Sequence, residues 1–176
     1  MALYFSWKTY IFSMTTFLGS AAVGRWLCSV IMSAPQLWRF TDGADCRSWS
    51  LGLVNAGPKV FSQGNQDGVL KDIFAIIGTT NTYFVEFGFG YEGRTINESV
   101  MDHADSGLNT RYLYKQGWHG MYFDAVVSAP EFNITQATLT EDNIGHHFTQ
   151  AGIPREPDYV SIDVDSLDVW LLRGML

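Results

Sequence analysis

The feature that most constrains the fold is an alternation, from residue 61 onward, between segments of helical periodicity and short strand-like runs. Apolar residues recur at helical spacing over 67–78, with Asp67 expected as the N-cap and Gly78 at the end. The run 82–88, "TYFVEFG", is rich in aromatic and β-branched residues and predicts a strand. Further helices are expected over 106–117 and 140–152, the latter capped by Thr140, and further strands over 120–125 and 158–165. This order is typical of an α/β sandwich with a mostly parallel sheet.

The first 40 residues differ in composition from the rest of the chain. Residues 9–24 carry no charge, with Lys8 before them and Arg25 after them. They fit a signal peptide, an anchor spanning 9–34, or an ordinary buried N-terminus, and Arg25 makes the spanning interpretation costly. The first two would place the protein in the secretory pathway or a membrane, and the third is compatible with the cytoplasm. The sequons at Asn97 and Asn133 would suit a lumenal domain.

The chain divides into a hydrophobic segment (1–40), a linker (41–60) containing glycines and a proline, and a domain over 61–176. Its two cysteines, Cys28 and Cys46, could form a disulfide or remain separate thiols, and no Cys/His spacing predicts a metal site. The net charge of −7 and the lack of a basic cluster argue against a nucleic-acid partner.

A glycine-rich stretch directly follows the strand predicted over 82–88. Gly88, Gly90 and Gly93 fit G-x-G-x-x-G, in which glycines allow a tight turn and a close approach of the backbone to a ligand. The polar insertion 94–105 delays the next helix, so the motif alone is weak evidence.

Asp124 ends the next predicted strand, where an acidic residue can accept hydrogen bonds from ribose hydroxyls. It lies further beyond Gly93 than the usual spacing of about 20 residues, and removing the insertion 94–105 brings it close to that value. A solvated strand end is the alternative interpretation of Asp124.

Glu86 indicates which cofactor such a loop would hold. An acidic side chain two residues before the first glycine would repel a diphosphate but would favour a ligand that carries an ammonium and a sulfonium. Glu86 therefore favours an S-adenosylmethionine-dependent methyltransferase over a nucleotide-linked oxidoreductase.

A group of acids follows the last predicted strand, where ligands bind in open α/β sheets. Asp163, Asp165 and Asp168 could provide a base for a substrate hydroxyl, a divalent metal site, or caps for the following helix. Asp165 or Ser166 is the expected N-cap in the last case. Trp118 and Tyr122 are expected in the core rather than as ligand-stacking residues.

Five segments taken together resemble the FkbM-type S-adenosylmethionine-dependent methyltransferases over residues 60–176. The segments are "FSQGNQDGVLKDIF", "YFVEFGFGYEG", "LNTRYLYKQGWHGMYFDA", "LTEDNI" and "GIPREPDYVSIDVDSLDVWLLRGML". The resemblance implies a Rossmann-like class I methyltransferase fold, of which this chain would contain the part up to the fourth strand and the start of its helix. Asn109 and Thr110 match the "NT" of the family.

The resemblance also implies the residues of the donor site. These would be Glu86, Gly88, Gly90 and Gly93 in the loop, Asp124 on the ribose where many members carry Glu, and Asp142 and Asn143 near the adenine. The expected reaction is methyl transfer to a hydroxyl of a sugar or small metabolite, with Asp163 or Asp165 as the base. The alternative is a non-catalytic interaction module, incomplete as an enzyme and anchored to a membrane through residues 9–34.

Overall fold

The computed structural model describes residues 48, 51–53, 57, 59–62, 64–88, 95–103, 106–164 and 167–176. Several predictions fall outside these residues: the hydrophobic segment 1–40, both cysteines, Gly90, Gly93, Asp165 and Ser166. Among the described residues, no helix combines the length and the apolar character needed to cross a membrane.

Four parallel strands form the sheet. They are β1 (Tyr83–Phe87), β2 (His119–Asp124), β3 (Ile134–Gln136) and β4 (Tyr159–Ile162), in the spatial order β3-β2-β1-β4. Every pairing between them is parallel. This order matches the first four strands of the Rossmann arrangement. The predicted α/β class, with a Rossmann-like parallel sheet, is confirmed.

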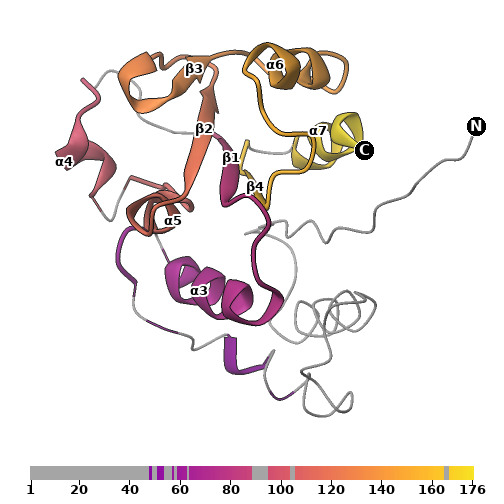
Figure 1. The fold of residues 1–176 in the computed structure, drawn as a ribbon. Coiled ribbons are helices and arrows are strands. Elements are labelled where there is room, and N and C mark those ends of the chain that lie inside the picture. The colour runs from indigo at the N-terminus through magenta and orange to yellow at the C-terminus, as the bar shows by residue number, and fades with distance from the viewer. Residues whose placement is uncertain are drawn as a thin grey trace, which may run out of the picture.

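Helices pack on both faces of this sheet (Figure 1). Helices α3 (Gln66–Ile77), α4 (Glu98–Met101) and α5 (Arg111–Lys115) contribute to the hydrophobic core on one face, and α6 (Ile144–Gln150) and α7 (Asp168–Met175) to the core on the other. The 3₁₀ helix η2 (Pro130–Phe132) precedes β3. The arrangement is a three-layer sandwich.

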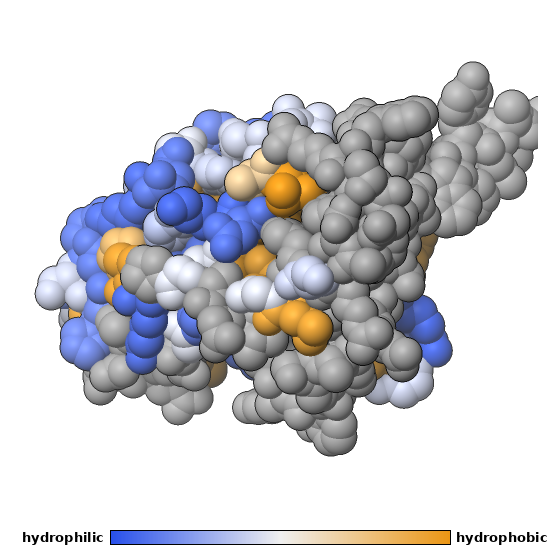
Figure 2. All heavy atoms as spheres, turned by 90° about the horizontal axis from the view of Figure 1, so that it is seen from below, coloured by the Kyte–Doolittle hydropathy of each residue, from blue (hydrophilic) through white to orange (hydrophobic). Residues whose placement is uncertain are grey.

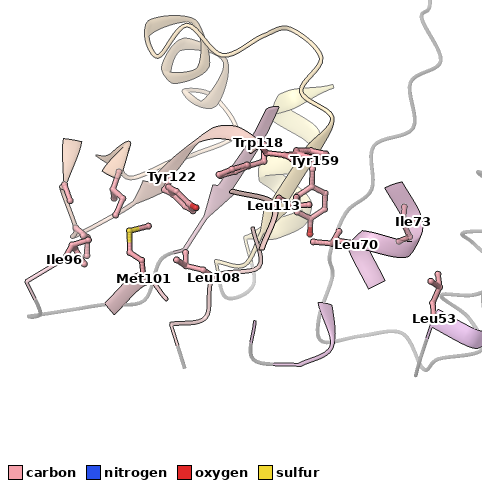
Figure 3. Close-up of a cluster of buried hydrophobic side chains, with 14 residues drawn as sticks. Leu53, Leu70, Ile73, Ile96, Met101, Leu108, Leu113, Trp118, Tyr122 and Tyr159 are labelled. Atoms are coloured by element: carbon pink, nitrogen blue, oxygen red, sulfur yellow. The ribbon is translucent and has the colours of Figure 1, made fainter. Parts of the chain in front are cut away.

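The two cores follow from the alternation of side chains along β1. Phe84 points into the cluster beneath α3, α4 and α5, whereas Val85 and Phe87 point into the cluster beneath α6 and α7. A strand buried on both faces reads as a continuous apolar run, which is why "YFVEF" is so hydrophobic. Figure 3 shows the first cluster, in which Trp118 and Tyr122 are both buried, as expected.

The strand predictions agree with the structure to within a few residues, but three helices begin at positions that the sequence did not predict. Asp67 is not the N-cap of α3: it lies inside the helix, and its Oδ2 accepts from the backbone N–H groups of Val60, Phe61 and Ser62 at 2.7–3.1 Å. Helix α5 starts at Arg111 rather than at 106, and α6 starts at Ile144 rather than after Thr140.

One carboxylate joins the loops before two neighbouring strands. Oδ2 of Asp158, just before β4, accepts from the N–H groups of Thr80, Asn81 and Thr82, just before β1, at 2.7–2.8 Å. These bonds satisfy backbone donors that no strand pairs. They fix the amino ends of β1 and β4 at the same level.

The described surface is mainly hydrophilic where Figure 2 views it, from below Figure 1, with separate small apolar areas. Helix α7 exposes two apolar side chains, Val169 at 57% and Trp170 at 49%, and Leu176, which follows the helix, is 86% exposed. These apolar side chains share the exposed side of α7 with the charged Arg173, whose side chain is 61% exposed and lies over the Trp170 ring.

Candidate functional site

Three of the predicted residues meet at the carboxyl edge of the sheet. Phe87, Phe123 and Ile162 are partners in the registers of β1 with β2 and β4, so the next residues, Gly88, Asp124 and Asp163, lie side by side. Gly88 N–H donates to the Phe123 carbonyl at 3.1 Å, and Asp163 N–H donates to the Phe87 carbonyl at 3.3 Å. Ligands of open α/β sheets bind at this edge.

Gly88 has no acceptable substitute in this geometry. Its φ is +84°, and a Cβ at this position would lie 1.9 Å from the Asp163 carbonyl oxygen. The conformation and the space both require glycine. The first glycine of the motif therefore turns the chain tightly against β4, as a Rossmann loop requires.

Asp124 closes the turn that follows β2. Its Oδ1 accepts from the N–H groups of Val126 and Val127, both at 2.8 Å, and the residue is 7% exposed. These two bonds hold the carboxylate at the strand end beside Gly88. The alternative of a freely solvated strand end does not describe this buried side chain.

Glu86 lies beneath the edge rather than at it. It is 2% exposed, and both of its oxygens accept hydrogen bonds from the segment before α5. Oε1 accepts from Asn109 N–H at 2.7 Å, and Oε2 accepts from Thr110 N–H at 3.1 Å and from the Thr110 hydroxyl at 2.5 Å. Burial raises the pKa of Glu86 to about 7, against the opposing effect of these hydrogen bonds. The expectation that Glu86 touches a ligand does not fit this geometry.

Asn109 also reaches the neighbouring strand. Its Nδ2 donates to Oγ of Ser161 in β4 at 3.2 Å, so Asn109, whose N–H is bonded to Glu86, links β1 to β4. Sequence reasoning placed these two residues at a helix start but missed their partner Ser161. The available signal was spacing: Ser161 precedes Asp163 by two residues, as Glu86 precedes Gly88, so the two polar side chains share one face.

The two residues expected near an adenine belong to the loop before α6. Asn143 uses its side chain inside this loop: Oδ1 accepts from Thr140 N–H at 2.7 Å and Nδ2 donates to the Thr138 carbonyl at 3.0 Å. Asp142 is exposed beside it. Their geometry gives Asn143 a structural role in the loop, and neither residue is in hydrogen-bond contact with the edge formed by Gly88, Asp124 and Asp163.

Two of the aspartates after β4, Asp163 and Asp168, have different positions and contacts in the structure. The strand ends at Ile162 rather than at the expected residue 165, and Asp165 lies outside the described residues. Asp163 is exposed at the edge, while Oδ1 of Asp168 accepts from Val164 N–H at 3.2 Å at the start of α7. Leu167 occupies the N-cap position. Within the described ranges, no group of three or more His, Cys, Asp or Glu residues is placed to hold a metal ion.

An ion-pair network fastens the inserted helix α4 to α5. The guanidinium of Arg111 is 1% exposed; it pairs with Glu98 and, at 2.7 Å, with Asp102, and it lies 4.7 Å from the Tyr114 ring centre. Lys115 pairs with the same two carboxylates at 3.3 and 2.8 Å. The polar insertion is therefore packed onto the helix whose start is fixed by Glu86.

The fold and this edge define an α/β domain of the Rossmann-like class with a glycine-turned, acid-lined edge. Comparison of the chain with protein-family models, with curated proteins and with solved structures found no match. The geometry of the edge is therefore the basis for any functional assignment.

Proposed function

We propose that this protein is an S-adenosylmethionine-dependent methyltransferase that acts on a hydroxyl group of a sugar or small metabolite. The observation that carries the proposal is the edge of the sheet, where Gly88 is sterically required to be glycine and stands between Asp124 and Asp163. The resemblance of residues 60–176 to the FkbM-type enzymes gives the same assignment. The bound donor would supply an electrophilic methyl group.

The residues present fit such a donor in part. Asp124 is held by two backbone N–H groups, so its carboxylate is oriented to accept hydrogen bonds from ribose hydroxyls. The tight turn at Gly88 brings backbone rather than side chain to the edge. Glu86 and Asn143 do not fit as ligands, because internal hydrogen bonds occupy them. Gly90, Gly93 and Asp165 stay predictions outside the described residues.

In this proposal the protein contributes mainly alignment of the acceptor with the methyl group. Asp163 is exposed at the edge and its backbone lies against Gly88, so we assign its carboxylate as the base that takes the proton of an acceptor hydroxyl. Asp142 is the remaining candidate for a contact with the adenine.

The test is a calorimetric titration of S-adenosylhomocysteine into the full chain and into Asp124→Asn. The amide keeps an oxygen that can accept from Val126 and Val127, so the turn is preserved while the charge is lost. We expect saturable binding by the wild type, weakened about tenfold or more in the variant, because hydrogen bonds to a charged acceptor contribute about 1.5–3 kcal/mol. The exposed Glu131→Gln serves as the control for loss of one charge. Absence of S-adenosylhomocysteine binding by folded wild-type protein would rule out the proposal.

A second candidate is the non-catalytic interaction module, because α7 exposes Val169 and Trp170 and is followed by the exposed Leu176. Exposed apolar groups that gather on one element mark interaction surfaces. This candidate predicts that the titration shows no donor binding. It also predicts self-association in sedimentation velocity that Trp170→Ser reduces and the exposed Lys71→Ser does not.

A further inference from the structure

Two rows of residues cross the sheet near its carboxyl edge. Tyr122, Glu86 and Ser161 are register partners in β2, β1 and β4 and form a buried polar row. The row Asp124, Gly88 and Asp163 follows two residues later on each strand. Because alternate residues of a strand share one face, the buried row lies directly behind the edge row.

The segment before α5 covers the buried row. Asn109 N–H and Thr110 N–H donate to separate oxygens of Glu86, and the Asn109 amide donates to Ser161. These bonds join β1 to β4 just below the point where Gly88 contacts Asp163. Any change in the charge of Glu86 therefore acts on the segment that supports the edge.

The carboxylate of Glu86 is shielded from direct contact with a ligand but not from its electric field. Glu86 is 2% exposed and its oxygens are occupied. In a buried environment the effective dielectric is low, so a charge acts over several ångströms. An ionised Glu86 therefore lowers the free energy of a cation at the edge, even though no atom of the cation touches it.

We propose that Glu86 is a positioning residue of the donor site whose ionised carboxylate makes the edge prefer the cationic sulfonium donor over the neutral thioether left after methyl transfer. This inference rests on the proposed function and concerns the same edge. The donor carries one more positive charge than the thioether. The field of Glu86 therefore favours binding of donor and release of product.

The charged and titratable groups around Glu86 are few in the described part of the chain. Tyr122 lies beside it on β2, and Asp163 follows β4 and opposes its ionisation. Arg111 begins α5 and is paired with Glu98 and Asp102 of α4. Asp67 of α3 is bound to the backbone of the loop before it. With burial raising the pKa of Glu86 to about 7, a cation at the edge can shift its ionisation near neutral pH.

The test compares S-adenosylmethionine with S-adenosylhomocysteine by calorimetric titration of the full chain at pH 6, 7 and 8. We expect the ratio of the two affinities to rise by up to about tenfold across this range, because the ionised fraction of a group with a pKa near 7 rises by about that factor and sets the upper limit. Titrations at pH 7 in buffers of different ionisation enthalpy should show more proton release with the sulfonium donor. Glu86→Gln should make the ratio independent of pH, and Thr110→Ser, which keeps the hydroxyl, should behave as the wild type.

The outcomes separate this inference from the function on which it rests. Saturable binding with a ratio that does not change with pH overturns the role of Glu86 and leaves the donor site in place. Absence of binding by either ligand at all three pH values overturns both. The wild-type ratio and the proton release decide the question even if Glu86→Gln does not fold.

Discussion

Comparison of Gly88, at the candidate site, with Gly117 separates the energetic cost of backbone strain from that of steric exclusion. Gly88 and Gly117 have nearly the same φ, +84° and +88°, but a Cβ at Gly117 would meet nothing within 4 Å, whereas at Gly88 it would lie 1.9 Å from the Asp163 carbonyl oxygen. Gly117→Ala therefore carries only the cost of a left-handed conformation. Gly88→Ala carries that cost and must also displace the backbone after β4.

The magnitudes follow from these two geometries. A left-handed alanine costs about 1–2 kcal/mol, partly offset by the lower entropy of the unfolded variant. Overpacking adds about 1–3 kcal/mol, and here the obstacle is backbone held by the bond from Asp163 N–H to the Phe87 carbonyl. We expect Gly117→Ala to lower the unfolding free energy by about 1 kcal/mol and Gly88→Ala by about 3 kcal/mol.

Urea denaturation followed by circular dichroism measures both values under the same conditions. The corresponding fall in melting temperature for Gly88→Ala is about 6–12 °C, from about 2–4 °C per kcal/mol for a chain of this size. Equal losses in the two variants would refute the steric argument. The edge would then have room for a side chain at position 88, and the close contact between Gly88 and Asp163 would not be a feature of the protein.

Three further predictions concern stability. Burial raises the pKa of Glu86 from 4.5 to about 7, so the stability that its protonated form contributes is fully present below the unfolded pKa and is lost as pH rises through 7. The unfolding free energy of the wild type relative to Glu86→Gln should therefore fall by about 3 kcal/mol between pH 4 and pH 8 in urea titrations. A constant or rising difference would contradict this. Asp158→Ala should cost about 2–3 kcal/mol, and Asp158→Asn, which keeps an acceptor oxygen, about half as much, by the same denaturation assay; equal costs would show that a neutral amide oxygen cannot replace the carboxylate as the acceptor of the three hydrogen bonds. Arg111→Met preserves most of the buried volume and should cost about 1–2 kcal/mol, less than the loss of a fully buried pair, because Glu98 is 58% exposed; a loss that exceeds about 4 kcal/mol would show that α4 and α5 unfold together.

The strands could be predicted because their patterns are local. The segment "YFVEF" is apolar except for Glu86 since both of its faces are covered, and this near-continuous apolar run identifies a central strand. Strand β3 could not be located: it has three residues, only Ile134 is buried, and the link from β2 through residues 125–133 contains a 3₁₀ turn instead of a helix. Such a short edge strand has no periodicity to read.

The helix starts and the role of Glu86 depend on contacts that sequence spacing does not contain. Residues 106–110 do not join α5, because the backbone N–H groups of Asn109 and Thr110 bind Glu86 from another part of the chain. The sequence predicted correctly that Gly88, Asp124 and Asp163 follow strands, and parallel register then brought them together. It could not predict that Glu86 faces inward rather than toward the edge, since that depends on which residues cover the face.

The bonds of Asp158 have a consequence for the order in which the protein folds. Asp158 and Thr80 are 78 positions apart in the sequence. Strand β1, whose residues Phe84 to Phe87 are all buried, pairs with β4, although β2, β3 and their helices lie between these two strands in the sequence. Contacts of such long range are slow to form. We therefore expect β1 to pair first with β2 during synthesis and to present an open edge until β4 is made. The Asp158 carboxylate would close that edge late, and in the interval β1 would be open to pairing with another chain.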